Sequence, residues 1–126
     1  MDTVVNLADA VRKGERKATE VLDQHAAAIG AADDKLNAFV HLDLDKAREA
    51  AEEIDARRAR GEDPGPLAGV PFGVKDLEDC AGMPTSYGSL LFKGGPPVAE
   101  DSIHVRRLKA AGAAGIVEYP LSKIID

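Results

Sequence analysis

Aromatic side chains are scarce in this 126-residue sequence, where they make up 4% of the residues and include no tryptophan. Single-stranded nucleic acids are commonly held by bases stacked on aromatic rings, so this scarcity argues against such a site. The formal net charge of −6 also argues against an extended phosphate-binding face. We therefore predict no nucleic-acid partner.

Cysteine and long apolar runs are also nearly absent. Cys80 is the single cysteine, so no disulfide can form within the chain, which favours a reducing compartment such as the cytoplasm. No apolar run approaches the roughly 20 residues that span a bilayer. The early residues carry charges from Asp2 onward and contain no apolar signal core. These absences predict a cytoplasmic protein without a membrane partner.

The residues that are abundant are those of one soluble globular domain, with 44% apolar and 30% charged side chains. In residues 1–61, three apolar stripes at helical spacing end at Gly14, Gly30 and Gly61, since glycine commonly terminates helices. The third helix is predicted to begin at a capping Asp43 or Asp45. Its charged face is most simply a solvated surface; that face carries Glu49, Glu52, Glu53, Asp55 and Arg57.

Strands are predicted in both the front and the back half of the chain. Residues 37–41 are short and apolar enough for a strand within the helical front, and residues 70–75 predict another in the back half, 62–126. An irregular stretch over 78–100 follows, then a helix capped by Asp101 or Ser102, and then an apolar strand cut short by Pro120. Strand, crossover helix and strand make one βαβ unit. The predicted fold class is α/β: N-terminal helices followed by part of a mixed β-sheet.

Several other chemical motifs in the sequence are weak. His41, Asp43 and Asp45 alternate, so they could share one face of a strand, but no further spacing supports a metal site. Cys80 lacks the local signature of cysteine proteases. Ser89 and Lys93 are four residues apart, one more than the Ser-x-x-Lys spacing of penicillin-binding enzymes requires. No cofactor or metal is predicted, and His25 is expected in the core.

Lys75 ends the strand "GVPFGVKD", and taken alone it is most simply a solvated strand end. Alternation places Phe72 and Val74 on one strand face and Lys75 on the other. The wider run from Gly65 to Ala113 resembles the amidase signature family of serine amidohydrolases. The resemblance rests on "LAGVPFGVKD", "GMPT", Gly88-Ser89, Asp101-Ser102 and "RLKAAGA", in the same order and spacing, and "LADAVRKGE" and "LNAFV" extend it toward the front.

The resemblance implies a fold, an activity and a role for Lys75. The family hydrolyses carboxylic amides through an acyl-enzyme, using a Ser–Ser–Lys triad, and Lys75 matches its general base. The resemblance thus implies a small-molecule amide as substrate and an incomplete amidase-signature domain over residues 1–126. Removing a lysine side chain from water lowers its pKa, and the neutral amine can then accept a proton, which fits that role.

The sequence departs from the family pattern in three places, one of which is the tail "AGIVEYPLSKIID" after "KAAGA". The Gly/Ser-rich segment that carries both triad serines in the family has no counterpart in the 51 residues after Lys75 (126 − 75). Lys17 also stands where the family favours a capping serine or threonine. We therefore expect a truncated amino-terminal segment that is inactive alone and self-associates through unpaired strand edges. The alternatives are a non-catalytic remnant and an acidic helical interaction module.

Overall fold

The computed structural model describes residues 2–39 and 41–119. In chain order it contains α1 (Val4–Lys13), α2 (Ala18–Leu36), β1 (His41–Leu42), α3 (Leu44–Ala59), β2 (Pro71–Lys75), α4 (Ile103–Ala110) and β3 (Ala114–Tyr119). The strands form one sheet in the order β1-β3-β2, with β1 antiparallel and β2 parallel to β3. The predicted α/β class, mixed sheet and βαβ unit are confirmed. Pro120, predicted to end the last strand, lies outside the described residues.

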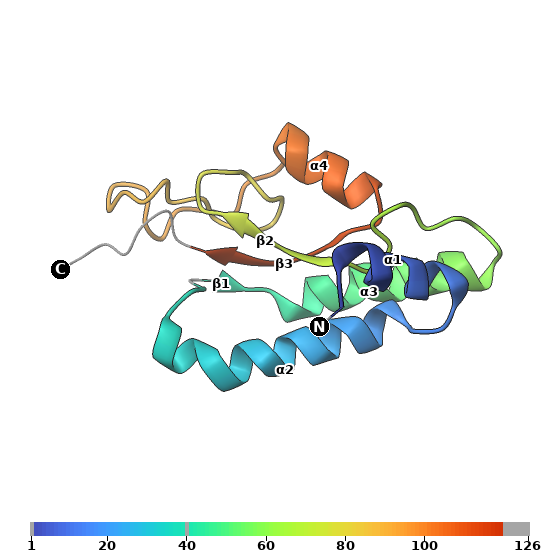
Figure 1. The fold of residues 1–126 in the computed structure, drawn as a ribbon. Helices are drawn as coiled ribbons and strands as arrows, with labels where there is room; N and C mark the ends of the chain where they lie inside the picture. The colour runs from blue at the N-terminus through green and yellow to red at the C-terminus, as the bar shows by residue number, and fades with distance from the viewer. Residues whose placement is uncertain (1, 40, 120–126) are drawn as a thin grey trace.

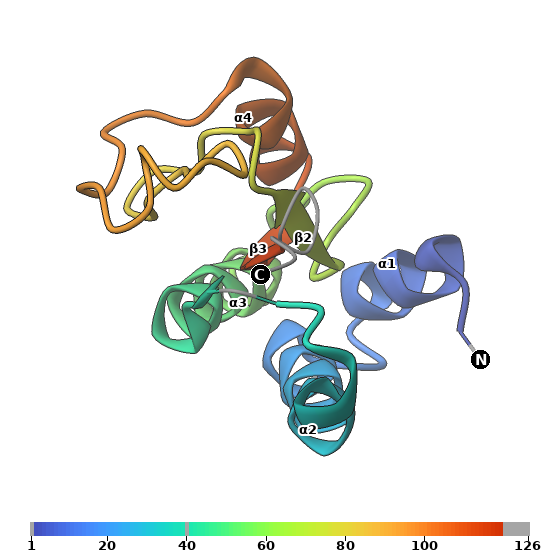
Figure 2. The same cartoon turned by 90° about the vertical axis from the view of Figure 1, so that its left-hand side faces the viewer.

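The sheet lies between two helical layers. Helices α2 and α3 cover one face, and the crossover helix α4 covers the other, with α1 beside α2 and α3 (Figures 1 and 2). Two hydrophobic clusters fill the spaces between the layers. The larger one joins α1, α2, α3 and the starts of β2 and β3, and its fully enclosed members include Val11, Val21, Ala47 and Ala51. The smaller one lies under α4 and consists of Val74, Cys80, Met83 and Val105, with Phe72 packed against it.

Helix α2 is longer than predicted, because it passes through Gly30 and ends at Leu36. The residue that ends it is Asn37, which adopts a left-handed conformation (φ 48°) and donates its N–H to the Asp33 carbonyl at 2.6 Å. The Asp33 carboxylate accepts the next two N–H groups, those of Ala38 and Phe39. This cap leaves only His41 and Leu42 for β1, so the strand predicted over 37–41 begins later than expected.

The charged face of α3 is not wholly solvated, and the sequence prediction is wrong for Asp55. This carboxylate accepts hydrogen bonds from the Ala18 N–H at 2.7 Å, the Thr19 N–H at 3.2 Å and the Thr19 hydroxyl at 2.9 Å. A carboxylate at a helix N-terminus satisfies unpaired N–H groups and interacts favourably with the helix dipole. Asp55 thus caps α2 from a neighbouring helix, which explains how a helix that starts after Lys17 does without a local serine or threonine.

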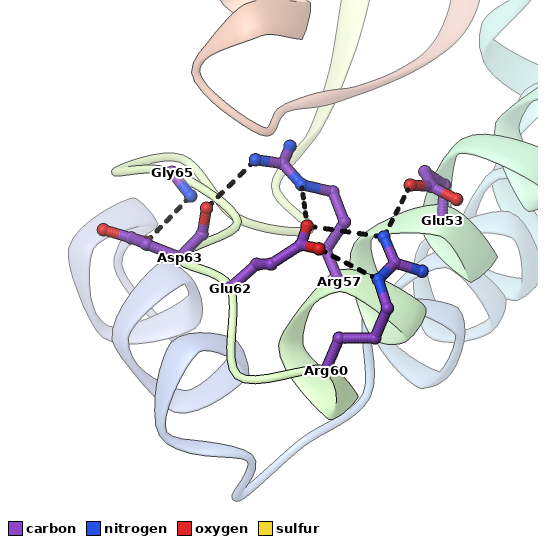
Figure 3. A network of polar contacts seen from close by, with 6 residues as sticks. All are labelled: Glu53, Arg57, Arg60, Glu62, Asp63 and Gly65. Atoms are coloured by element: carbon purple, nitrogen blue, oxygen red, sulfur yellow. Dashed lines mark hydrogen bonds and ion pairs between the residues drawn. The ribbon is translucent and has the colours of Figure 1, made fainter.

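Glu53 and Arg57 of that face take part in a surface network at the end of α3 (Figure 3). Arg60 donates to Glu62 at 3.0 Å and to Glu53 at 3.3 Å, and Arg57 donates to the Asp63 carbonyl at 3.1 Å. The hydrogen bond from Arg60 lowers the pKa of Glu62 below its ordinary value. Exposed ion pairs contribute little stability individually, so the network mainly orients the turn that leads from α3 toward β2.

Backbone hydrogen bonds join the segment just before β2 to the segment that leads into β3, and we call this pairing the seam. Leu67 N–H donates to the Ala111 carbonyl at 2.8 Å, Gly69 N–H to the Gly112 carbonyl at 2.9 Å, and Ala114 N–H to the Val70 carbonyl at 2.8 Å. The two segments lie so close together that a Cβ on Gly112 would be 2.3 Å from the Pro64 carbonyl oxygen. Gly112 also has φ 94°, a conformation that other residues rarely adopt. The seam therefore depends on glycine at this position.

Two glycine substitutions should shift stability in opposite directions. Gly112→Ala should lower the free energy of unfolding by about 2–4 kcal/mol, because it combines a positive φ with a backbone clash. Gly30→Ala should raise it by about 0.5–1 kcal/mol, because Gly30 lies inside α2 and nothing within 4 Å would meet its Cβ. Urea unfolding followed by circular dichroism measures both. Equal changes in the free energy of unfolding for the two substitutions would contradict the requirement for glycine at position 112.

Candidate active site

Lys75 is the last residue of β2 and its side chain is exposed. The strand ends there because the chain turns at once, with the N–H groups of Leu77 and Glu78 both donating to the Lys75 carbonyl at 2.7 and 2.9 Å. The Lys75 backbone position is thus held by a tight turn. Within the described part of the chain, no carboxylate or hydroxyl contacts its ammonium group.

The neighbours of Lys75 in β2 anchor the strand from the opposite face. Val74 is buried and Phe72 packs with it in the cluster under α4, whereas Gly73 and Lys75 are exposed. The predicted alternation along β2 is therefore confirmed. One strand face is fixed by apolar packing under α4, and Lys75 on the other face is exposed.

Asp76, directly after Lys75, is the feature that the sequence analysis missed. Its carboxylate is buried, with 4% of the residue exposed. It accepts a hydrogen bond from the Ser86 N–H at 2.6 Å and another from the Ser86 hydroxyl. A buried carboxylate needs such donors, because its desolvation is otherwise costly. Asp76 therefore ties the segment after the "GMPT" turn to the end of β2.

A second aspartate reinforces the same tie. Asp79 accepts from the Thr85 hydroxyl at 2.8 Å and from the Tyr87 hydroxyl at 3.3 Å. The negative charge of Asp79 raises the pKa of Tyr87 above its ordinary value. Residues 85–87 are thus held beside the strand end by two carboxylates. The signal in the sequence is the pair of aspartates at 76 and 79 followed by three consecutive hydroxyl residues, but only the fold matches each acceptor to its donor.

Asp101 closes the loop on the α4 side. Its carboxylate accepts from the Ala81 N–H at 2.8 Å and from the Lys109 ammonium at 2.7 Å. Burial raises the pKa of Asp101, but the hydrogen bonds from Lys109 and Ala81 outweigh it, and the net pKa lies below the ordinary value. Of the two residues predicted to cap α4, Ser102 occupies the cap position, yet its side chain makes no capping hydrogen bond. Asp101 instead joins the loop to the helix.

The remaining candidate residues have structural roles, as a helix cap or within the core. Asp43 and Asp45 are not in a strand with His41, as the alternation had allowed, because Asp43 caps α3 by accepting from the Lys46 N–H at 3.1 Å. Cys80 is buried in the cluster under α4. Across residues 2–39 and 41–119, no three histidine, cysteine or acidic side chains gather as a metal site would require.

The other serine, lysine and histidine candidates lie on the surface or at its margin. Ser89 accepts from the Leu91 N–H at 3.2 Å in an exposed loop, in which Lys93 is also exposed. His25 is half-buried rather than enclosed in the core, and its Nδ1 donates to the Val21 carbonyl at 2.8 Å. None of the described helices is long and apolar enough to cross a membrane.

Comparison with known proteins agrees with the fold. Residues 20–125 match the family model named Amidase. This chain belongs to the amidase family. Over 110 residues it is 47% identical to a glutamyl-tRNA(Gln) amidotransferase subunit from Salinispora arenicola, a match that covers 87% of this chain and 22% of that protein.

Solved structures of amidases contain the same arrangement. The inhibitor-bound vestigial complex linked to the origins of an s-triazine catabolic enzyme matches with a TM-score of 0.91 and 39% identity, over 96% of this chain and 26% of that one. The native peptide amidase of Stenotrophomonas maltophilia matches with a TM-score of 0.85 and 36% identity, over 95% and 25%. The chain thus spans about a quarter of its amidase relatives and has the fold of that part of them.

The lowered pKa of Asp101 predicts a loss of stability in acid. A carboxylate with a depressed pKa stabilises the fold above its ordinary pKa, 3.8, and this contribution is lost as pH falls through the lower value of the folded state. Asp101→Asn should therefore cost on the order of 1–3 kcal/mol at pH 7, and the difference from the parent chain should shrink below pH 4. Unfolding free energies measured between pH 2.5 and 7 test this.

The matched control for this experiment is Asp34→Asn, at an exposed aspartate for which the described residues provide no hydrogen bond. Its effect on stability should be small and nearly independent of pH. A cost for Asp101→Asn that stays constant from pH 7 down to pH 2.5 would show that the carboxylate charge does not stabilise the loop.

Proposed function

We propose that residues 1–126 form the N-terminal part of an amidase domain that hydrolyses carboxylic amides through an acyl-enzyme, with Lys75 as the general base. The observation that carries the proposal is the position of Lys75. It ends the parallel strand β2, beside a loop tied down by Asp76, in a chain whose fold and sequence match amidases over residues 20–125.

The chemistry of lysine fits this role under one condition. A lysine ammonium cannot accept a proton, and only removal from water, or a nearby positive charge, lowers its pKa enough for the neutral amine to be populated near pH 7. Lys75 is exposed in this chain. The proposal therefore requires that further polypeptide of the amidase domain cover the open face of β2 and enclose the amine.

In the proposed reaction, the neutral Lys75 amine takes a proton through a bridging serine from the hydroxyl of a nucleophilic serine, and both serines come from the rest of the domain. The serine oxygen attacks the amide carbonyl, the C–N bond breaks, and the amine leaves with a proton. Water then attacks the resulting ester, which releases the carboxylic acid and restores the serine. This sequence uses no cofactor, and the substrate is a small-molecule amide.

The anchoring of Lys75 supports this role physically. A general base must be held within hydrogen-bonding reach of its partner, and β2 is fixed by Val74 in the core, by the turn at Leu77 and Glu78, and by Asp76. The strand backbone thus places the Lys75 Cα, while the long side chain keeps the reach that proton transfer needs.

A chimera tests the role of Lys75. Residues 1–119 of this chain would replace the matching quarter of the Stenotrophomonas maltophilia peptide amidase, and release of ammonia from a peptide amide would be measured. Lys75→Ala should lower kcat by about 10²–10⁴-fold, the usual contribution of a general base. Lys75→Arg should be equally impaired, since a guanidinium stays protonated at any accessible pH.

Lys93 provides the matched control, because it is also an exposed lysine but lies outside β2, in the loop that follows Ser89. Lys93→Ala should leave kcat within about twofold of the chimera. The proposal is wrong if Lys75→Arg retains most of the rate while the chimera remains folded and active.

The isolated chain should not hydrolyse simple amides above the uncatalysed rate. In the proposed reaction the nucleophile and the donors that stabilise the oxyanion come from other polypeptide, and a lone lysine has nothing to activate. The measurement is ammonia release from a generic amide by purified chain. Turnover that disappears on Lys75→Ala would show that a serine within residues 1–126 acts as the nucleophile.

A further inference from the structure

Tyr87 has a backbone conformation that tyrosine rarely adopts. Its φ is 55°, in the left-handed region, where the Cβ of an L-residue crowds the carbonyl oxygen. The other described non-glycine residue with a positive φ is Asn37, which ends α2, and asparagine tolerates this conformation. Tyr87 lies instead in the loop between β2 and α4. A residue held in a strained conformation commonly marks a functional position.

Hydrogen bonds hold Tyr87 against the segment that follows Lys75. The Tyr87 hydroxyl donates to the Asp79 carboxylate at 3.3 Å, and the preceding Ser86 donates its N–H to Asp76 at 2.6 Å. The charge of Asp79 is the main cause that raises the pKa of Tyr87, and the charge of Asp76 adds to it. Figure 1 shows this loop beyond the tip of the β2 arrow. Tyr87 therefore lies within electrostatic reach of the residue next to Lys75.

The Tyr87 ring pairs with Phe92 farther along the same loop. The ring centroids are 5.5 Å apart and the ring planes meet at 74°, which is an edge-to-face contact. Tyr87 is nevertheless 44% exposed and Phe92 is 52% exposed. Binding sites for small molecules are lined mainly by apolar and aromatic side chains that stand ready before the ligand arrives. The pair has the chemistry of such a wall, because it leaves aromatic surface uncovered near the strand end.

The charges beside the pair restrict the ligand further. Asp76 and Asp79 are both negative and both act on Tyr87, whereas an amide group is neutral. A carboxylate on the acyl group of a substrate would be repelled there, because like charges brought together are costly. The acyl group that suits the pair is therefore neutral and apolar.

We propose that Tyr87 and Phe92 form an apolar wall of the substrate site and select amides whose acyl group carries an aromatic side chain. This inference rests on the proposed function, because it places the wall beside the lysine of the amidase reaction. A third ring can pack on the exposed surface of the pair at the usual centroid spacing of about 4.5–7 Å. Tyr87 is then a specificity-determining residue that contacts the acyl group and takes no part in proton transfer.

A purely structural role for Tyr87 predicts a different result. If the contact with Phe92 and the hydrogen bond to Asp79 served only to hold the loop, removal of the ring would impair the hydrolysis of every amide alike. A role in specificity predicts that the loss depends on the acyl group. The two roles are therefore distinguished by comparing two substrates.

The chimera with the Stenotrophomonas maltophilia peptide amidase provides the test, with peptide amides that end in phenylalaninamide or in glycinamide. Tyr87→Asn removes the ring and suits the left-handed backbone. It should raise KM for the phenylalaninamide peptide about tenfold, within the range of discrimination that an apolar contact provides. KM for the glycinamide peptide, and kcat for both peptides, should change by less than about twofold.

Two further variants show whether the ring itself is responsible. Tyr87→Phe keeps the ring and loses only the hydrogen bond to Asp79, so the ratio of the two KM values should stay within about twofold of the parent chimera. Leu91→Asn is the matched control, because Leu91 is an apolar residue of the same loop, 90% exposed and outside the aromatic pair. It should also leave the ratio unchanged. Circular dichroism checks that all three variants fold.

Binding to an inactive chimera separates this inference from the role of Lys75. In the Lys75→Ala chimera, calorimetry should show that Tyr87→Asn weakens binding of the phenylalaninamide peptide about tenfold and leaves the glycinamide peptide unchanged. If Lys75→Ala does not lower kcat but this difference holds, the proposed base is wrong and the substrate wall stands. The inference is overturned if Tyr87→Asn affects both peptides equally, if Leu91→Asn reproduces its effect, or if Tyr87→Phe is impaired as strongly.

Discussion

The parallel pairing of β2 with β3 is the constraint on which the rest of this structure depends. Parallel strands need a crossover, so the pairing requires residues 76–113 to leave one end of β2 and return to the other end through α4. The three backbone hydrogen bonds from Leu67, Gly69 and Ala114 set where the two strands begin. From that origin, a one-residue register shift between Phe72 and Gly73 brings Lys75 opposite Tyr119 at the far end of the pair.

The loop that makes the crossover is held by aspartates rather than by regular structure. Asp76 and Asp79 hold residues 85–87, and Asp101 joins Ala81 to Lys109 of α4. Each carboxylate accepts more than one donor, and this arrangement compensates the cost of removing it from water. The result is a long irregular segment with defined anchor points beside the strand end. Amidases with a TM-score of 0.85 or more share this part of the fold.

The open edge of the sheet and the exposed lysine are two consequences of one arrangement. Helices α2, α3 and α4 cover the sheet on both faces (Figure 2), but β2 remains an edge strand with a groove beside it. Lys75, at the end of this edge strand, is exposed.

Local sequence signals determined most of the secondary structure. Apolar spacing located α1, α3 and α4, alternation placed Phe72 and Val74 on one face of β2, and the motif "GVPFGVKD" located Lys75 at a strand end. These predictions hold because helical and strand periodicity depend on neighbours within a few residues. The amidase resemblance was visible for the same reason, in short ordered motifs.

Tertiary structure decided the features that depend on residues far apart in the chain. Asp55 caps α2 from 37 residues away, and Asp76 becomes a buried acceptor for Ser86. In the sequence each of these aspartates is simply a charged residue, since nothing in the local pattern shows which donor it will meet. Only the packing of α3 against α2, and of the loop against β2, brings each carboxylate to unpaired N–H or O–H groups.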